Sequence, residues 1–192
     1  MPWTIAAWIG ATWAGWLLGL LLIIGFAVIG DAIGLSGVQS LVGAGMGVGV
    51  GFTQARLVRR RLVPAFWPWF RSCAIGITAP FLVTDILNAV GLGVPYSLQL
   101  AVTIGGLLAG LMQTRILEKR FRHARSWIVA STVGWLLAAA TSGTADMLFQ
   151  AKQLRGIGGA LLYVGVIAAG GLLLGMVTSL PLSRLLRQEP EA

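Results

Sequence analysis

Charge is the scarcest property of this 192-residue sequence. Only 10% of its residues are Asp, Glu, Lys or Arg, whereas 57% are hydrophobic. Soluble domains carry about 25% charged residues, because charges cover the surface that faces water. This composition excludes an ordinary soluble domain and indicates that the bilayer is the solvent of most side chains.

Histidine and cysteine are nearly absent, with one of each, His123 and Cys73. A single cysteine forms no intrachain disulfide. The two residues cannot supply three protein ligands to a metal, and a lone histidine in a basic loop excludes haem or chlorophyll ligation by an intramembrane histidine. Ser36 lies in a G-x-S-G stretch like that of rhomboid proteases, but its base would have to be His123, expected on the opposite side of the membrane. The sequence therefore predicts no enzyme, no metal and no cofactor.

Long apolar runs fill the rest of the chain. A membrane span needs about 20 mostly apolar residues. Barrel strands alternate in polarity at every second residue, and these runs do not, so they predict helices. Six segments qualify, at about 3–30, 35–54, 70–91, 96–117, 126–148 and 157–179. The expected fold class is an all-α integral membrane protein, with one transmembrane domain over residues 1–192 and a short disordered tail at 188–192.

The basic residues predict the orientation. Twelve of the fourteen lie in the segments after the second, fourth and sixth spans, and only Lys152 and Arg155 lie elsewhere. The net charge of +8 is thus clustered between apolar runs, which is typical of a membrane protein and not of a nucleic-acid-binding protein. The positive-inside rule places both termini in the cytoplasm, with the chain as a multi-pass protein of the bacterial inner membrane. The expected contacts with anionic lipid headgroups are Arg56, Arg59, Arg60, Arg61, Arg115, Lys119, Arg120 and Arg122.

Internal similarity predicts three tandem two-helix hairpins. Trp8 and the stretch Gly15-Trp16-Leu17-Leu18 recur as Trp127 and Gly134-Trp135-Leu136-Leu137, with a weaker copy at Trp69 and Gly76. In the even spans, Gly47, Gly51, Gln54 and Arg56 recur fifty-nine residues later as Gly106, Gly110, Gln113 and Arg115. The units span about 1–62, 63–121 and 122–187. Units with an even number of spans are parallel, so we expect a pseudo-threefold axis along the membrane normal.

Two stretches carry a family resemblance, "GFTQARLVRRRLVPAFWPWF" and "GLMQTRILEKRFRHARSWIVASTVGWLL". They resemble bacterial multi-pass membrane proteins built on a glycine-rich helix, a Gln followed by Leu and Arg, and a helix that starts with Trp. Gln54-Ala55 and Gln113-Thr114 stand where that family has a Gln-Trp pair. The family has no established activity, so the resemblance implies an architecture and not a function.

The glycine run "VGAGMGVGVG" at 42–51 raises the question of a phosphate loop. Its spacing lacks the G-x-G-x-x-G pattern and no strand precedes it, which excludes a dinucleotide fingerprint. On a helix, glycines at i, i+4 and i+8 form one smooth face that lets another helix approach closely, in this chain or in a second copy. The predicted helix-packing residues are Gly43, Gly47, Gly51, Gly106, Gly110, Gly171 and Gly175.

Two sets of polar residues within the spans are candidate sites. Gln54, Gln113 and Thr178 occupy equivalent positions near the cytoplasmic side, so the repeat would bring them toward one axis as a polar cluster or as bonds between helices. Asp31, Asp85 and Asp146 lie near the outer ends of their spans, where they are either interfacial or ion-handling acids. Most tryptophans, among them Trp8, Trp69 and Trp127, are expected in an aromatic belt at the cytoplasmic interface.

Three functions fit these features. The first is a non-enzymatic accessory or scaffold subunit that packs through its glycine faces and binds membrane lipid, itself or partner membrane subunits. The second is a small-solute or ion transporter or channel along the repeat axis. The third is the substrate-binding membrane subunit of a larger transporter. Bound lipid is the one non-protein component we expect.

Overall fold

The structure, a computed structural model, describes residues 2–151 and 155–187, with the side chains of residues 2, 3 and 61 excluded. Within these ranges every element is an α-helix, and all six are long and apolar enough to cross a membrane, which confirms the predicted multi-pass helical class. The predicted tail at 188–192 lies outside the described residues. The helices are α1 (Pro2–Ala32), α2 (Ser40–Arg61), α3 (Phe66–Ala89), α4 (Ser97–Leu117), α5 (Ser126–Gln150) and α6 (Gly156–Leu185).

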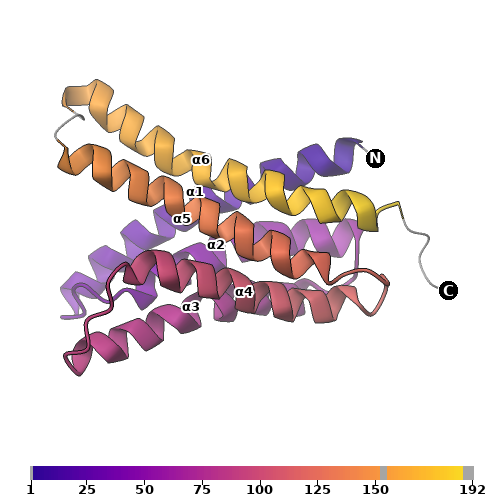
Figure 1. Cartoon of the computed structure of the whole chain (residues 1–192), viewed down its shortest axis with the longest axis horizontal. Coiled ribbons are helices and arrows are strands. Elements are labelled where there is room, and N and C mark those ends of the chain that lie inside the picture. The colour runs from indigo at the N-terminus through magenta and orange to yellow at the C-terminus, as the bar shows by residue number, and fades with distance from the viewer. Residues whose placement is uncertain (1, 152–154, 188–192) are drawn as a thin grey trace.

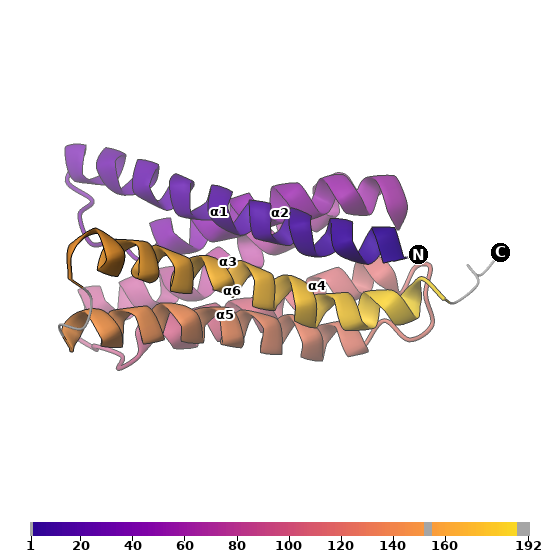
Figure 2. The same ribbon diagram turned by 90° about the horizontal axis from the view of Figure 1, so that it is seen from above.

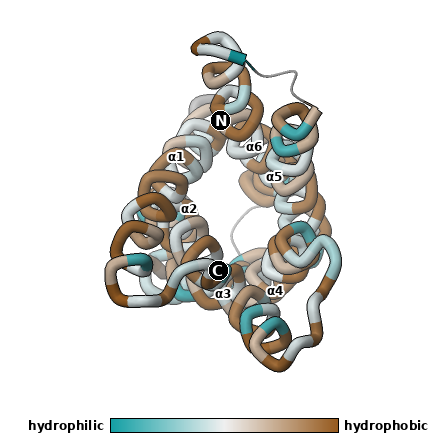
Figure 3. Tube along the Cα trace, turned by 90° about the vertical axis from the view of Figure 1, so that its left-hand side faces the viewer, coloured by the Kyte–Doolittle hydropathy of each residue, from teal (hydrophilic) through white to brown (hydrophobic). Residues whose placement is uncertain are grey.

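The six helices form a ring. Each packs against its neighbours in sequence, and α6 closes the ring by packing against α1. Seen along the bundle, the helices follow one another around a common centre (Figure 3). The start of α1 and the end of α6 lie at the same end of the bundle, with the α2–α3 and α4–α5 loops (Figures 1 and 2). We call this the basic end, because the loops and helix termini there carry twelve of the fourteen Lys and Arg residues.

The start of α2 differs from the prediction by five residues, since the helix begins at Ser40 and not near 35. Gly34 and Gly37 have φ of +79° and +77°, a left-handed conformation that glycine adopts without steric cost and that ends helical geometry in the α1–α2 loop. At its other end α2 continues past the predicted 54 to Arg61, so several arginines stand on the helix itself. Helix α6 likewise continues through Pro181 to Leu185.

One glycine face of α2 packs against α3. A Cβ built on Gly43 would lie 2.6 Å from the Phe81 ring, and one on Gly47 would lie 2.9 Å from the Cys73 carbonyl oxygen. A Cβ on Gly51 would lie 2.7 Å from the Cys73 Cβ. These distances leave no room for a side chain. The helix that meets this face therefore belongs to the same chain.

A second glycine face of α2 packs against α1, and the sequence interpretation did not identify it. A Cβ on Gly49 would lie 2.5 Å from the Gly15 carbonyl oxygen and 2.6 Å from the Gly19 Cα. A Cβ on Gly45 would lie 2.9 Å from the Ile23 nitrogen. Two glycines separated by one residue lie about 200° apart around a helix. The run at 43–51 therefore presents one glycine face to α3 and another to α1.

The remaining predicted glycines pack in the same manner. A Cβ on Gly106 would lie 2.6 Å from the Trp135 Cβ, and one on Gly110 would lie 2.9 Å from the Ser131 Cβ, both on α5. On α6, a Cβ on Gly171 would lie 2.5 Å from the Trp16 Cβ, and one on Gly175 would lie 3.0 Å from the Ile9 Cα, both on α1. In a bilayer, such close approach supplies the van der Waals packing that holds helices together.

The interior has two aromatic levels. The level nearer the basic end contains Trp8, Trp69 and Trp127. The middle level contains Trp16 and Trp135, whose ring centroids are 5.9 Å apart, together with Phe81. Beyond the middle level α1 and α6 separate toward the opposite end of the bundle (Figure 1). These two helices are accordingly the least buried of the six.

Candidate functional site

Three tryptophans meet at the centre of the ring near the basic end. Trp8 comes from α1, Trp69 from α3 and Trp127 from α5, and none is more than 1% exposed. Their ring centroids are 5.4–6.1 Å apart with the rings edge to face, the arrangement that aromatic quadrupoles favour. The aromatic-belt prediction is therefore wrong for these three residues, which fill the axis instead of the interface.

Each indole N–H donates a hydrogen bond to a polar side chain of an even helix. Trp8 Nε1 donates to Thr178 Oγ1 at 2.9 Å. Trp69 Nε1 donates to Gln54 Oε1 at 3.4 Å, and Trp127 Nε1 donates to Gln113 Oε1 at 2.7 Å. The three polar residues singled out from the sequence thus lie in one buried layer, each joined to one of the tryptophans.

The glutamine amides extend this layer to neighbouring helices. Gln54 Nε2 donates to Thr12 Oγ1 at 3.1 Å, and Gln113 Nε2 donates to Cys73 Sγ at 3.1 Å. The Cys73 thiol lies 3.9 Å from Gln54 Oε1, so a chain of polar contacts crosses α1, α2, α3, α4 and α5. We call these residues the tryptophan–glutamine layer: Trp8, Thr12, Gln54, Trp69, Cys73, Gln113, Trp127 and Thr178.

The tryptophan–glutamine layer contains no Asp, Glu, His, Lys or Arg, and no group of three or more His, Cys, Asp or Glu in the described ranges could hold a metal. Its hydrogen bonds are worth about 0.6–2 kcal/mol each in a membrane. Chemically, such a layer can join helices and fill the axis. It offers no base beside Cys73, whose polar neighbours are two amides.

The three tryptophans were not among the sequence-predicted sites, and neither were Thr12 and Cys73, the partners of the glutamine amides. A signal was available, because Thr12, Cys73 and Ser131 each follow one of the three tryptophans by four residues. A spacing of four keeps a side chain on the same helix face. Ser131 Oγ donates to the Gly106 carbonyl at 2.8 Å, so the third member of this series also joins two helices.

The three aspartates lie at the end opposite the basic end, and each accepts a hydrogen bond. Asp31 accepts from Ser36 Oγ at 2.7 Å, and Asp146 accepts from Tyr163 Oη at 2.9 Å. Asp85 accepts from the backbone N–H groups of Gln39 and Ser40, both at 2.8 Å. The structure does not bring the three acids into one cluster, because each serves a different loop or helix end.

Asp85 acts as the N-terminal cap of α2 from a distant part of the chain. Gln39 precedes the helix and makes no side-chain cap of its own. We expect Asp85→Ala to lower the free energy of unfolding by about 1–2 kcal/mol, because it removes an acceptor and a negative charge at the positive end of the helix dipole. Asp85→Asn should lose about half of that.

Thermal unfolding in detergent micelles measures this effect. Asp31→Ala is the matched control, since Asp31, in the last turn of α1, accepts from the hydroxyl of Ser36 in the loop that follows, and we expect it to change stability by about 0.5 kcal/mol or less. Equal losses for the two alanine variants would contradict the capping role of Asp85.

The predicted headgroup contacts stand at the basic end. Arg56 lies 5.0 Å from the Phe52 ring centroid, and Arg59 lies 6.0 Å from that of Phe66, within the range of cation–π attraction. Arg120 donates to the Leu62 carbonyl oxygen, so it anchors the α2–α3 turn. Arg60, Arg115, Lys119 and Arg122 are exposed, whereas the side chain of Arg61 lies outside the described part of the chain.

Comparison with protein-family models, with curated proteins and with solved structures gives no match for this chain. Functional inference therefore depends on the residues and geometry above.

Proposed function

We propose that the protein is a non-enzymatic multi-pass membrane protein that serves as an accessory or scaffold subunit, with its basic end in the cytoplasm and in contact with anionic lipid. The observation that carries this proposal is the tryptophan–glutamine layer. It is neutral and buried, and its hydrogen bonds include a residue from each of the six helices, which suits a rigid body rather than a reacting or moving site.

The proposal includes three parallel hairpins about a pseudo-threefold axis. Trp8, Trp69 and Trp127 each donate to an even helix, which makes three pairs of the same kind, α1 with α6, α3 with α2, and α5 with α4. Each of these pairs joins the odd helix of one hairpin to the even helix of another, and recurrence of one contact at all three junctions supports descent of the hairpins from a common unit.

Transport of a small solute or ion along the axis is the second candidate. It is favoured by the presence of Gln54, Gln113 and Thr178 in one layer. Two observations favour the scaffold instead: the indole rings fill the axis at that level, and the two amides are already bonded to Trp69 and Trp127. A solute would have to displace these bonds and separate the rings.

Assembly must use a surface other than the predicted glycines, because those are covered within the chain. Ala6, Gly10 and Ala14 lie exposed at i, i+4 and i+8 on α1, and a Cβ on Gly10 would meet nothing within 4 Å. We expect Gly10→Leu to lower the assembled fraction about tenfold without lowering the melting temperature, since a leucine keeps another helix backbone at a distance. The measurement is native mass spectrometry after purification in mild detergent.

Gly25→Leu is the control for this experiment. Gly25 lies on the same helix with the same open space, but its neighbours at i−4 and i+4 are Leu21 and Ile29. Equal effects of the two variants would remove the argument for the Ala6–Gly10–Ala14 face. A wild-type chain that is monomeric without partner proteins and that conducts ions or solutes in proteoliposomes would overturn the scaffold proposal in favour of transport.

A further inference from the structure

The described residues that line one pocket at the basic end all have cationic or polar side chains. This pocket measures about 430 Å³ and lies between the α4–α5 loop and the last turn of α6. This volume falls within the ~300–1,000 Å³ range of small-ligand pockets. The lining residues are Arg122, His123, Arg125, Ser126 and Arg184. We call it the loop pocket.

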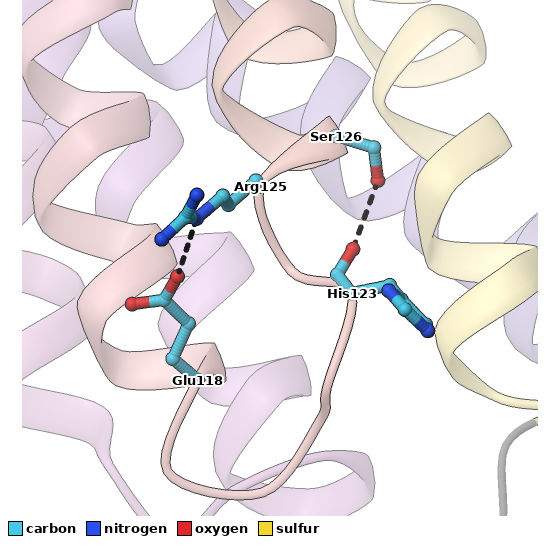
Figure 4. A network of polar contacts seen from close by, with 4 residues as sticks. All are labelled: Glu118, His123, Arg125 and Ser126. Atoms are coloured by element: carbon cyan, nitrogen blue, oxygen red, sulfur yellow. Dashed lines mark hydrogen bonds and ion pairs between the residues drawn. The ribbon is translucent and has the colours of Figure 1, made fainter.

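The side chains of the α4–α5 loop point in two directions (Figure 4). His123 turns toward α6, the helix that carries Arg184. Arg125 turns to the other side, where its Nε lies 3.6 Å from Glu118 Oε1. That ion pair is largely solvent-exposed, with side chains 89% and 42% accessible, so it is weak enough to exchange for a stronger anion.

The electrostatics of the loop pocket favour an anion. Among the described residues, the five that line it include three arginines and no acid. Helix α5 begins at Ser126 with no acidic residue in its first turn, and the Trp127 and Ile128 N–H groups donate to the Ala124 and Arg125 carbonyl oxygens. No carboxylate of this first turn therefore opposes an anion at this end. Guanidinium groups and hydroxyls are groups that proteins use to hold phosphate oxygens.

We propose that the loop pocket binds a phosphate monoester group, the dianion shared by free phosphate esters and by lipids with a phosphomonoester headgroup. Arg184 and His123 hold it from the side of α6, and Ser126, whose hydroxyl otherwise donates to the His123 carbonyl oxygen, holds it from the side of the loop. Arg125 exchanges Glu118 for the phosphate. If the phosphate belongs to a lipid, this site extends the proposed lipid contact of the basic end and rests on that proposed function. Binding of a soluble phosphate ester would not depend on it.

The test compares Arg184→Gln with Arg59→Gln, an exposed arginine of the same end that lies outside the loop pocket. In one arm, each protein is loaded with a mixture of phosphatidic acid and phosphatidylglycerol, and native mass spectrometry reports which lipid is retained. In the other arm, thermal unfolding in lipid-free detergent is followed against inorganic phosphate concentration. We expect Arg184→Gln, and not Arg59→Gln, to weaken binding about tenfold, the loss of one charge-assisted contact.

Glu118→Gln sharpens the test because it should strengthen binding by freeing Arg125. Preference for phosphatidic acid with no response to inorganic phosphate assigns the pocket to a lipid headgroup. Stabilisation by inorganic phosphate with no preference for phosphatidic acid assigns it to a soluble phosphate ester. Equal weakening by Arg184→Gln and Arg59→Gln, or no selectivity for the monoester, overturns the proposal. The same spectra also report assembly. Intact complexes that show no selectivity for the phosphate monoester would overturn the phosphate site and leave the scaffold proposal standing.

Discussion

Gly49→Ala is expected to destabilise the protein by at least about 2–3 kcal/mol, although alanine is intrinsically the better helix former by about 1 kcal/mol. The added Cβ would lie 2.5 Å from the Gly15 carbonyl oxygen and 2.6 Å from the Gly19 Cα. Both are backbone atoms, so no side chain can rotate away and the helices themselves must separate. Separation of α1 from α2 also stretches the bond from Gln54 to Thr12, which joins the same two helices.

The control is Gly25→Ala, where the added Cβ would meet nothing within 4 Å. There the propensity gain acts alone, and we expect stability to stay the same or to rise by up to about 1 kcal/mol. Thermal unfolding in detergent, followed by tryptophan fluorescence, measures both variants. If Gly49→Ala melted at or above the wild-type temperature, the close contact of α1 and α2 would be wrong.

Trp127→Ala is the second large effect, with an expected loss of about 3–5 kcal/mol. The substitution removes the ring that touches both Trp8 and Trp69, and it takes from Gln113 Oε1 the hydrogen bond that Trp127 donates. No rearrangement of a fully packed axis refills that volume. Trp67→Ala is the control, because Trp67 is 61% exposed on the surface and should cost far less.

A double-mutant cycle isolates the hydrogen bond from the packing. Gln113→Leu leaves the indole N–H of Trp127 buried without an acceptor, which costs about 1–3 kcal/mol. Trp127→Phe keeps an aromatic ring and removes the donor, so the double variant should be more stable than the sum of the single losses predicts. Strict additivity, measured by thermal unfolding, would show that the two residues do not interact.

The apolar length of each span sufficed to predict six helices, because a bilayer leaves backbone groups few alternatives. The repeat spacing also pointed to Gln54, Gln113 and Thr178 as a set, and all three lie in one layer. The role of Trp8, Trp69 and Trp127 was mistaken, since a tryptophan near a span end is most often interfacial. Only the arrangement of the ring brings these three into the axis.

The second glycine face was missed for a different reason. Glycines at i, i+4 and i+8 share one helix face. That spacing identifies Gly43, Gly47 and Gly51, and it leaves out Gly45 and Gly49 because they belong to another face. The capping of α2 by Asp85 is equally invisible in the sequence, because the acceptor stands about forty-five residues after the N–H groups that it binds. Local patterns do not reveal contacts made by chain reversal through a loop.

The closure of the ring between α1 and α6 has a consequence for biosynthesis. The first and the last helices of the described chain form one seam, where Trp8 donates to Thr178 and Trp16 donates to the Ile167 carbonyl. Because synthesis runs from the N-terminus, α1 enters the membrane well before its partner exists. Until α6 arrives, the N–H groups of these two indoles lack their acceptors, so the seam is the last part of the molecule to mature.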